Sequence, residues 1–257
     1  MSYACRLRQG PKTIARVTLN DLPFVRDPSS AFRDTARPCS HFLVPGENWL
    51  TLEVWDGPVS PDSPQLQGPV DVMIQEIETE KTLARIAWPA FAINAGQKLE
   101  ALEMPFLFTM KFELPEEHPK PRYDGLPKES IPEEGTADLV DAVARLRESL
   151  ASRNAKAFVG ENALKLDEQR RFYGDSRDFD SSGLVAAYER RFQDPLAVQP
   201  VEPEQLRFEG RAKNRVAYVT RKDGRPTISA RGVLDPGQSY ELDPLFVRHD
   251  GRWTLLA

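Results

Sequence analysis

The segment from residue 178 to residue 189 has the spacing of a calcium-binding loop. Oxygen-bearing side chains occupy positions 1, 3, 5 and 12 of that template and glycine occupies position 6, as Asp178, Asp180, Ser182, Glu189 and Gly183. A calcium ion takes six or more oxygen ligands, and this spacing can place them around one point. The segment is therefore a candidate calcium site.

A helix cap accounts for the same residues. Ser182 would cap a helix that begins near Leu184, with Asp180 close to the positive end of its dipole. Gly174 interrupts the helix that should enter a calcium loop, and the sequence has no second copy of the loop. We favour the cap, and calcium is the only cofactor that the sequence suggests.

Two tryptophans share one face of a predicted strand. In residues 49–55 the apolar Leu50, Leu52 and Val54 alternate with a second set that includes Trp49 and Trp55. If exposed, these indoles would stack on a sugar or anchor a protein partner. We favour a covered position for both, under the linker or a second domain, because tryptophan is usually largely buried.

The usual catalytic motifs are missing from the sequence. It contains no Gly-x-Ser-x-Gly nucleophile, no dinucleotide or phosphate loop and no His-Glu-x-x-His zinc motif. The three histidines, His41, His118 and His249, lie far apart along the chain. We therefore predict no catalytic residues.

The composition predicts a soluble, cytoplasmic protein. The 257 residues carry a net charge of −5 and no basic run of five or more, so we expect no nucleic-acid partner. Apolar runs such as 87–93 are far shorter than the ~20 residues of a membrane helix, and the N-terminus lacks the apolar stretch of a signal peptide. Two cysteines, Cys5 and Cys39, suit a reducing compartment.

Residues 1–114 have the pattern of an antiparallel β-sandwich. Short alternating runs are predicted as strands, and turn signals such as Pro45-Gly46 and Gly68-Pro69 separate them. The predicted strands are Thr13–Leu19, Trp49–Trp55, Val70–Ile74, Thr82–Trp88 and Phe106–Phe112. Several short strands without a helix favour a sandwich.

Residues 115–135 are predicted to be a linker. Five prolines stand among charged residues, with few apolar side chains to bury. The alternative is that this segment lies along the surface of either domain.

Residues 136–257 are predicted to fold as an α+β domain. Thr136 caps a helix whose apolar stripe is Leu139, Val143, Leu146 and Leu150. Further helices are expected at 155–173 and 183–193, followed by strands at 205–211, 215–221, 226–232, 245–249 and 253–256. Asp223-Gly224 and Asp250-Gly251 are hairpin signals.

The order of helices followed by strands, ending in the hairpin at 246–255, resembles the NTF2-like (cystatin-like, SnoaL-like) α+β family over residues 136–257. The resemblance implies a curved sheet wrapped around a helix to form an apolar pocket, and a domain that in many members forms dimers. Enzymes of that family hold an Asp/His pair in the cone, whereas the only histidine in residues 136–257 is His249, beside a turn. The polar groups expected in the cone are Tyr173, Tyr188 and Tyr240.

Residues 19–23 and 44–54 look like the galactose-binding-like jelly rolls that are appended to many larger proteins. The matching features are a Pro-Gly turn, then Asn48, able to adopt a left-handed conformation, then a strongly alternating strand. The resemblance supports a sandwich and says little about a ligand.

These patterns together predict a two-domain, non-catalytic module that binds a protein partner, with a homodimer formed through the C-terminal domain. A bacterial toxin-immunity or secretion-accessory role fits such an acidic chain. The alternative is an NTF2-like enzyme or carrier that holds a small apolar molecule in the cone. A filled C-terminal interior favours the binding module, while an open cavity with converging polar groups favours the alternative.

Overall fold

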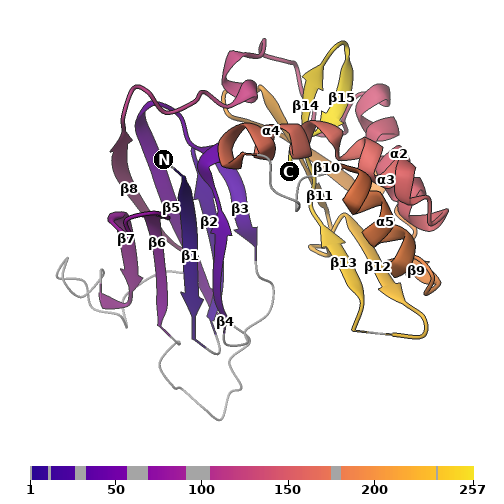
Figure 1. Ribbon diagram of the computed structural model, residues 1–257, viewed down its shortest axis with the longest axis horizontal. Coiled ribbons are helices and arrows are strands. Elements are labelled where there is room, and N and C mark those ends of the chain that lie inside the picture. Colours follow the sequence, from indigo (N-terminus) through magenta and orange to yellow (C-terminus); the bar gives the residue numbers. More distant parts are fainter. Residues whose placement is uncertain are drawn as a thin grey trace. The chain divides into compact units, whose positions relative to one another are not determined.

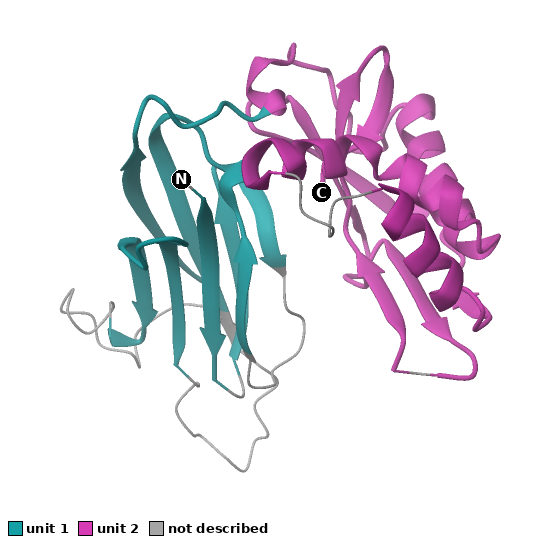
Figure 2. Ribbon diagram, in the orientation of Figure 1, with its two compact units in different colours: residues 1–121 teal, residues 122–257 magenta. Residues whose placement is uncertain are grey.

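The computed structural model describes residues 2–10, 13–26, 33–56, 69–90, 105–174, 181–235 and 237–257. The chain divides into two compact units, Met1–Pro121 (unit 1) and Arg122–Ala257 (unit 2), shown in separate colours in Figure 2. The division falls inside the proline-rich segment 115–135. Within the described ranges, no helix has the length and apolar character needed to cross a membrane.

Unit 1 contains two four-stranded antiparallel sheets (Figure 1). One sheet has the strand order β4-β1-β6-β7 and the other the order β3-β2-β5-β8. Contacts between β1 and β2, β2 and β6, and β7 and β8 join the two sheets. The strands are β1 Tyr3–Gln9, β2 Thr13–Leu19, β3 Leu22–Arg26, β4 Arg33–Pro38, β5 Gly46–Asp56, β6 Val70–Glu76, β7 Thr82–Trp88 and β8 Phe106–Leu114. This arrangement is compatible with the predicted sandwich.

Alternation along the strands decides which face is buried. Leu50, Leu52 and Val54 of β5 are fully buried, whereas Trp49, Thr51 and Glu53 are not. β5 pairs with β2 on one side and with β8 on the other, so its apolar set adds to one continuous inner face. The alternation predicted for 49–54 is confirmed, while β1, β3 and β4 were not predicted.

Both cysteines are buried free thiols of unit 1. Cys5 lies in β1, and Cys39, just after β4, donates its backbone N–H to Tyr3 O at 2.9 Å. Burial raises the pKa of the Cys5 thiol to about 12 and raises the pKa of Cys39 well above its ordinary value. Neither thiol is therefore ionised near neutral pH.

The described helices of unit 2 are α2 Ala137–Ala151, α3 Ala155–Glu161, α4 Ala163–Tyr173 and α5 Ser181–Arg191. The predicted α2 stripe is confirmed, since all four of its apolar residues are buried. The prediction of one helix over 155–173 is wrong, because the helix is interrupted at Asn162, between α3 and α4. The Asn162 side-chain amide donates to Phe158 O at 2.8 Å and competes with the backbone for it.

Unit 2 has two antiparallel sheets, with orders β10-β11-β14-β15 and β13-β12-β9. The strands are β9 Leu196–Val198, β10 Leu206–Arg211, β11 Val216–Arg221, β12 Ile228–Gly232, β13 Ser239–Leu242, β14 Leu245–His249 and β15 Arg252–Leu255. The hairpin predicted at Asp250-Gly251 is confirmed, and both residues have positive φ.

The hairpin predicted at Asp223-Gly224 is wrong, because β11 and β12 belong to different sheets. The turn is closed by a backbone hydrogen bond from Gly224 N to Arg221 O at 3.1 Å and by side chains. The Asp223 carboxylate accepts from Arg221 Nε at 3.1 Å and Nη2 at 2.7 Å, and from Arg225 N at 3.1 Å. Strands β9 and β13 were not predicted.

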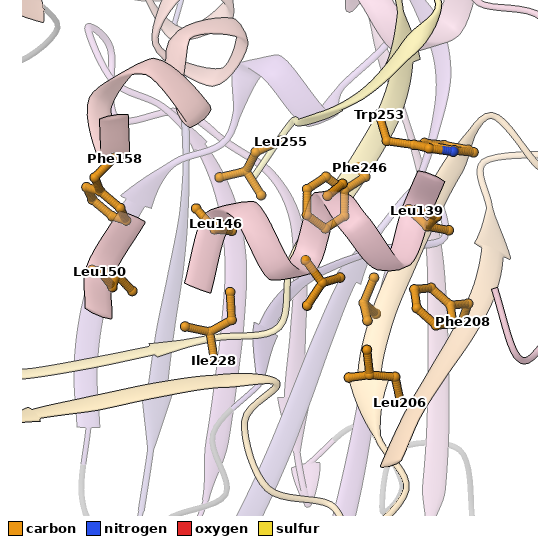
Figure 3. Close-up of a cluster of buried hydrophobic side chains, with 14 of the residues drawn as sticks. Leu139, Leu146, Leu150, Phe158, Leu206, Phe208, Ile228, Phe246, Trp253 and Leu255 are labelled. Carbon is orange, nitrogen blue, oxygen red and sulfur yellow. The ribbon is translucent and has the colours of Figure 1, made fainter. Parts of the chain in front are cut away.

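One hydrophobic cluster fills the space between α2 and the strands of unit 2 (Figure 3). Its largest members include Phe208, Phe246 and Trp253, all at most 2% exposed. Gly135 lets the chain approach this cluster before α2 begins, because a Cβ there would lie 2.7 Å from the Phe208 ring. Large side chains therefore occupy the interior on the side that α2 covers.

Residues of the proline-rich segment pack on the unit to which each belongs. His118 is buried in unit 1, where its Nε2 lies 3.2 Å from Ser40 O. In unit 2, Tyr123 is buried, Glu129 N donates to Asn214 O at 2.8 Å, and Phe208 N donates to Glu133 O at 2.9 Å. The segment is shared between the two units.

Candidate functional site

Trp49 is an exposed aromatic residue of unit 1. Its side chain is 44% exposed on the outer face of β5, so the covered position that we favoured is wrong for this residue. The indole N–H donates to Glu47 Oε1 at 3.0 Å, and Glu47 forms an ion pair with Lys111, which lies opposite Trp49 on β8. The Lys111 ammonium lowers the pKa of the Glu47 carboxyl. The ring is thus held by its polar edge while its apolar surface faces solvent.

Asn20 fixes the backbone of Trp49. Asn20 N donates to Trp49 O at 3.0 Å, and Trp49 N donates to Asn20 Oδ1 at 2.9 Å. Asn20 has a φ of 52°, a left-handed conformation that asparagine tolerates better than most residues. Both backbone hydrogen-bonding groups of Trp49 therefore have partners.

Asn48 supports the same region from inside. This buried side chain accepts from Asn20 Nδ2 at 2.8 Å and Val44 N at 2.9 Å, and donates to Val44 O at 2.7 Å and Gly46 O at 2.9 Å. The left-handed residue of the turn is Gly46, with φ 76°, while Asn48 belongs to β5. The left-handed role expected for Asn48 is therefore wrong.

The outer face of β5 and β8 around Trp49 is mixed in character. Thr51 and Thr109 hydroxyls lie 3.1 Å apart, and Arg16 pairs with Glu53 at 3.5 Å. Leu107 is 64% exposed further along β8. Trp55 lies in β5, but its side chain is outside the described residues, so its predicted exposure or cover stays a prediction.

Tyr188 and Tyr240 meet in an aromatic cluster of unit 2. Their ring centroids lie 6.4 Å apart, and Phe192 lies 5.6 Å from Tyr188 and 6.2 Å from Tyr240. Phe158 closes the cluster at 4.8 Å from Tyr188. Burial, and then the nearby Tyr240 hydroxyl, raise the pKa of Tyr188, so the Tyr188 phenol is a neutral hydrogen-bonding group at pH 7.

Tyr173 occupies a different place from the other two tyrosines. It is the last residue of α4, with its ring 6.5 Å from Phe172. Of the three tyrosines predicted for the cone, the structure brings together Tyr188 and Tyr240.

The calcium-loop candidate is described only in its second half. Asp178 and Asp180 lie outside the described residues, while Ser182 and Glu189 are both exposed in α5. Ser182 lies inside the helix, not before it, so its predicted role as N-cap is wrong. Glu189 lies seven residues after Ser182 in the helix, so the two positions are roughly 10.5 Å apart along the axis, which disfavours one shared ion. Among the described residues, no group of three His, Cys, Asp or Glu side chains could hold a metal ion.

Comparison of the chain with protein-family models, with curated proteins and with solved structures gives no match. The resemblances to NTF2-like and galactose-binding-like domains therefore remain predictions.

One exposed apolar group was not predicted from the sequence. Val233 and Leu234 are 58% and 78% exposed in the loop between β12 and β13. Two apolar residues between Gly232 and the turn-forming Asp235 are the local signal that could have indicated this loop.

Proposed function

We propose that this protein is a non-catalytic protein-binding module, and that Trp49 is an anchor of its recognition surface. The observation that carries the proposal is an exposed indole whose backbone and polar edge are both held by neighbouring groups. Tryptophan is enriched among residues that dominate binding energy. An anchor that is ordered before binding loses less conformational entropy when it docks.

The filled interior of unit 2 supports a binding module over a small-molecule carrier. The cluster beneath α2 consists of large apolar side chains in mutual contact. In this proposal unit 1 is a jelly-roll-like sandwich and unit 2 an NTF2-like domain through which two copies associate. An accessory role in bacterial toxin immunity or secretion is consistent with such a module.

The test begins by placing a photo-crosslinking amino acid at position 51, beside Trp49 on the same face of β5, in cells that make the protein. The captured protein is identified, purified and titrated by calorimetry against the full chain and the Trp49→Ala variant. We expect Trp49→Ala to weaken binding by about 2 kcal/mol, roughly 30-fold, with an unchanged melting temperature. Ile77→Ala is the matched control, because Ile77 is 47% exposed in the turn that follows β6, a strand of the other sheet.

Equal binding by Trp49→Ala and the parent chain would refute this role for Trp49. If the protein instead binds glycans on an array, and Trp49→Ala abolishes that binding, Trp49 contributes to sugar recognition.

A second candidate function rests on Tyr188 and Tyr240, which bring two phenol groups together beside Phe158 and Phe192. Such a cluster would contact a small apolar molecule with polar ends. The test is a thermal-shift screen of small aromatic compounds with the full chain. A stabilising compound whose effect is lost in the Tyr188→Phe/Tyr240→Phe variant would favour this candidate.

A further inference from the structure

The loop between β12 and β13 presents apolar side chains to solvent. Leu234, at 78%, is the most exposed large apolar side chain in the described part of the chain, and its neighbour Val233 is 58% exposed. Two adjacent exposed aliphatic side chains are unfavourably hydrated in the free protein, and burying them against a partner contributes favourable binding free energy.

The Asp194 carboxylate holds the backbone of this loop, together with backbone hydrogen bonds. Asp194 accepts from Leu234 N at 2.8 Å and from Asp235 N at 3.0 Å, and Val233 N donates to Pro195 O at 2.8 Å. Gly232 permits this approach, because a Cβ there would lie 2.2 Å from Asp194 Oδ2. The two aliphatic side chains are therefore displayed on an ordered backbone.

The loop is continuous with the C-terminal end of α5 and with the tyrosine pair. Gln238 Nε2 donates to Arg191 O at 3.0 Å and lies 3.3 Å from the Tyr240 hydroxyl. The Arg191 guanidinium lies 5.8 Å from the centre of the Tyr188 ring. Gln238 thus links the loop to Arg191 and to Tyr240. We use the name hairpin surface for the group made of Val233, Leu234, Arg190, Arg191, Arg231 and the partly buried Tyr188 and Tyr240.

Three arginines at the hairpin surface lack carboxylate partners. Arg190, Arg191 and Arg231 are exposed, and in the described ranges none of them forms an ion pair. Arginines elsewhere do pair, as Arg85 does with Asp71 at 2.7 Å and Arg225 with Asp223 at 3.3 Å. Two carboxylates near the loop are already engaged, because Asp194 holds the loop and Asp235 Oδ1 accepts from Gly237 N at 3.0 Å.

We propose that the hairpin surface docks into a partner protein that offers an apolar pocket bordered by carboxylates. Leu234 and Val233 enter the pocket, and Arg190, Arg191 and Arg231 meet its acidic rim. Arginine and tyrosine are enriched at protein interfaces. The inference rests on the proposed function only in taking protein recognition as the activity, since it uses residues of unit 2 and none of the residues around Trp49.

A protein partner fits the charges better than an anionic lipid surface does. The chain as a whole carries a net charge of −5, which opposes approach to an anionic membrane. Exposed Glu189 and Asp235 beside the loop add local negative charge. A shaped acidic rim can pair with the arginines while avoiding these two carboxylates, whereas a lipid surface cannot.

The test selects ligands from a random 16-residue peptide library displayed on phage, with the full-length chain as bait. We expect selected peptides to combine aromatic or aliphatic residues with flanking Asp and Glu. Calorimetry with one synthetic peptide should show affinity at least about tenfold weaker for Leu234→Asp and for Arg190→Glu/Arg191→Glu. Ile77→Asp is the matched control and should bind normally, and melting curves should confirm that every variant is folded.

Each other outcome overturns the proposal. One is a failure to select acidic peptides, and another is unchanged affinity in Leu234→Asp. Flotation with vesicles of phosphatidylcholine and phosphatidylserine that Leu234→Asp abolishes would assign the loop to membranes. A dimer of the parent chain that Leu234→Asp converts to monomer, measured by light scattering, would assign it to a second copy. Peptide binding lost in Trp49→Ala but kept in Leu234→Asp would refute this proposal and leave the Trp49 proposal standing.

Discussion

Trp49 and Leu234, two of the exposed apolar residues in the described part of the chain, are held in place by different means. Trp49 belongs to a strand with neighbours on both sides, and Asn20 and Asn48 satisfy the backbone around it. Leu234 stands in a loop whose backbone is held by the Asp194 carboxylate and by a few backbone hydrogen bonds, such as that from Val233 N to Pro195 O. Many hydrogen bonds of the sheet hold the backbone of a residue in a strand, whereas only a few hold the backbone of a residue in this loop. The loop should therefore be easier to loosen without unfolding its unit.

The largest expected effect separates a buried tryptophan from the exposed one. Trp253→Ala removes a side chain that is 2% exposed in the core of unit 2, and we expect a loss of about 3–5 kcal/mol in the free energy of unfolding. Trp49→Ala, in unit 1, should change the free energy of unfolding by less than about 1 kcal/mol, because the indole is partly exposed to water. Urea denaturation of both variants measures the difference. Similar losses in the two variants would show that Trp49 is a core residue.

The second expected effect compares Asn48, which supports the backbone around Trp49, with Asp194, which holds the loop of Leu234. Asn48→Ala leaves partly buried backbone groups of the 44–46 turn without the partner that Asn48 provides, and we expect a loss of about 1–3 kcal/mol in the stability of unit 1. Asp194→Ala frees amides that water can reach, so its cost should be nearer about 1 kcal/mol. Hydrogen exchange at the amides of Leu234 and Asp235 should accelerate in Asp194→Ala while the Trp49 amide keeps its rate. Faster exchange at the Trp49 amide as well as at the loop amides would show that the two regions are not held independently.

Acid should weaken unit 1 through His118. Burial lowers the pKa of His118 below its ordinary value of 6.5, although the carbonyl groups of Ser40 and Leu43 oppose this shift. The unfolded chain then binds a proton more readily than the folded chain. The stability that the neutral ring contributes is complete above about pH 6.5 and is lost as the pH falls through the folded-state value.

The measurement for His118 is the free energy of unfolding between pH 7.5 and pH 5. A His118→Phe variant should have a shallower dependence over this range, since other groups titrate equally in both proteins. Identical slopes in the parent chain and the variant would show that His118 does not contribute.

The smallest effect concerns calcium. If residues 178–189 hold no ion, millimolar calcium should leave the melting temperature unchanged. Binding to the native state alone would add RT ln(1 + [Ca²⁺]/Kd), about 2.7 kcal/mol at a hundredfold excess over Kd. A rise in melting temperature that Glu189→Gln abolishes would establish a site there, whereas a rise that persists in that variant would place the ion elsewhere.

Local patterns predicted the elements whose one face is strongly apolar. The β5 alternation and the α2 stripe are both clear because the buried and exposed sets differ sharply in polarity. β1 was not predicted although Tyr3, Cys5 and Leu7 alternate with Arg6 and Arg8, because a tyrosine and a cysteine give a weak apolar signal. The division of residues 155–173 into α3 and α4 depends on the side chain of Asn162, which periodicity ignores.

The candidate sites depended on contacts between distant residues, which one sequence does not reveal. Trp49 was recognised as a surface candidate, but its exposure depends on what covers that face of the sheet. The support of Leu234 comes from Asp194, forty residues earlier in the chain. A short polar residue before a proline gives no sign that it will hold a loop so far away.

The buried cysteines make the chain a ready substrate for site-selective labelling. With a pKa of about 12 for Cys5 and a pKa well above the ordinary value for Cys39, the native thiols should ignore maleimide reagents while unit 1 stays folded. A single cysteine introduced at position 234 would then carry a fluorophore without prior removal of the native ones. Both native thiols belong to unit 1, so the slow reaction of the parent chain with a thiol reagent would time the opening of that unit alone.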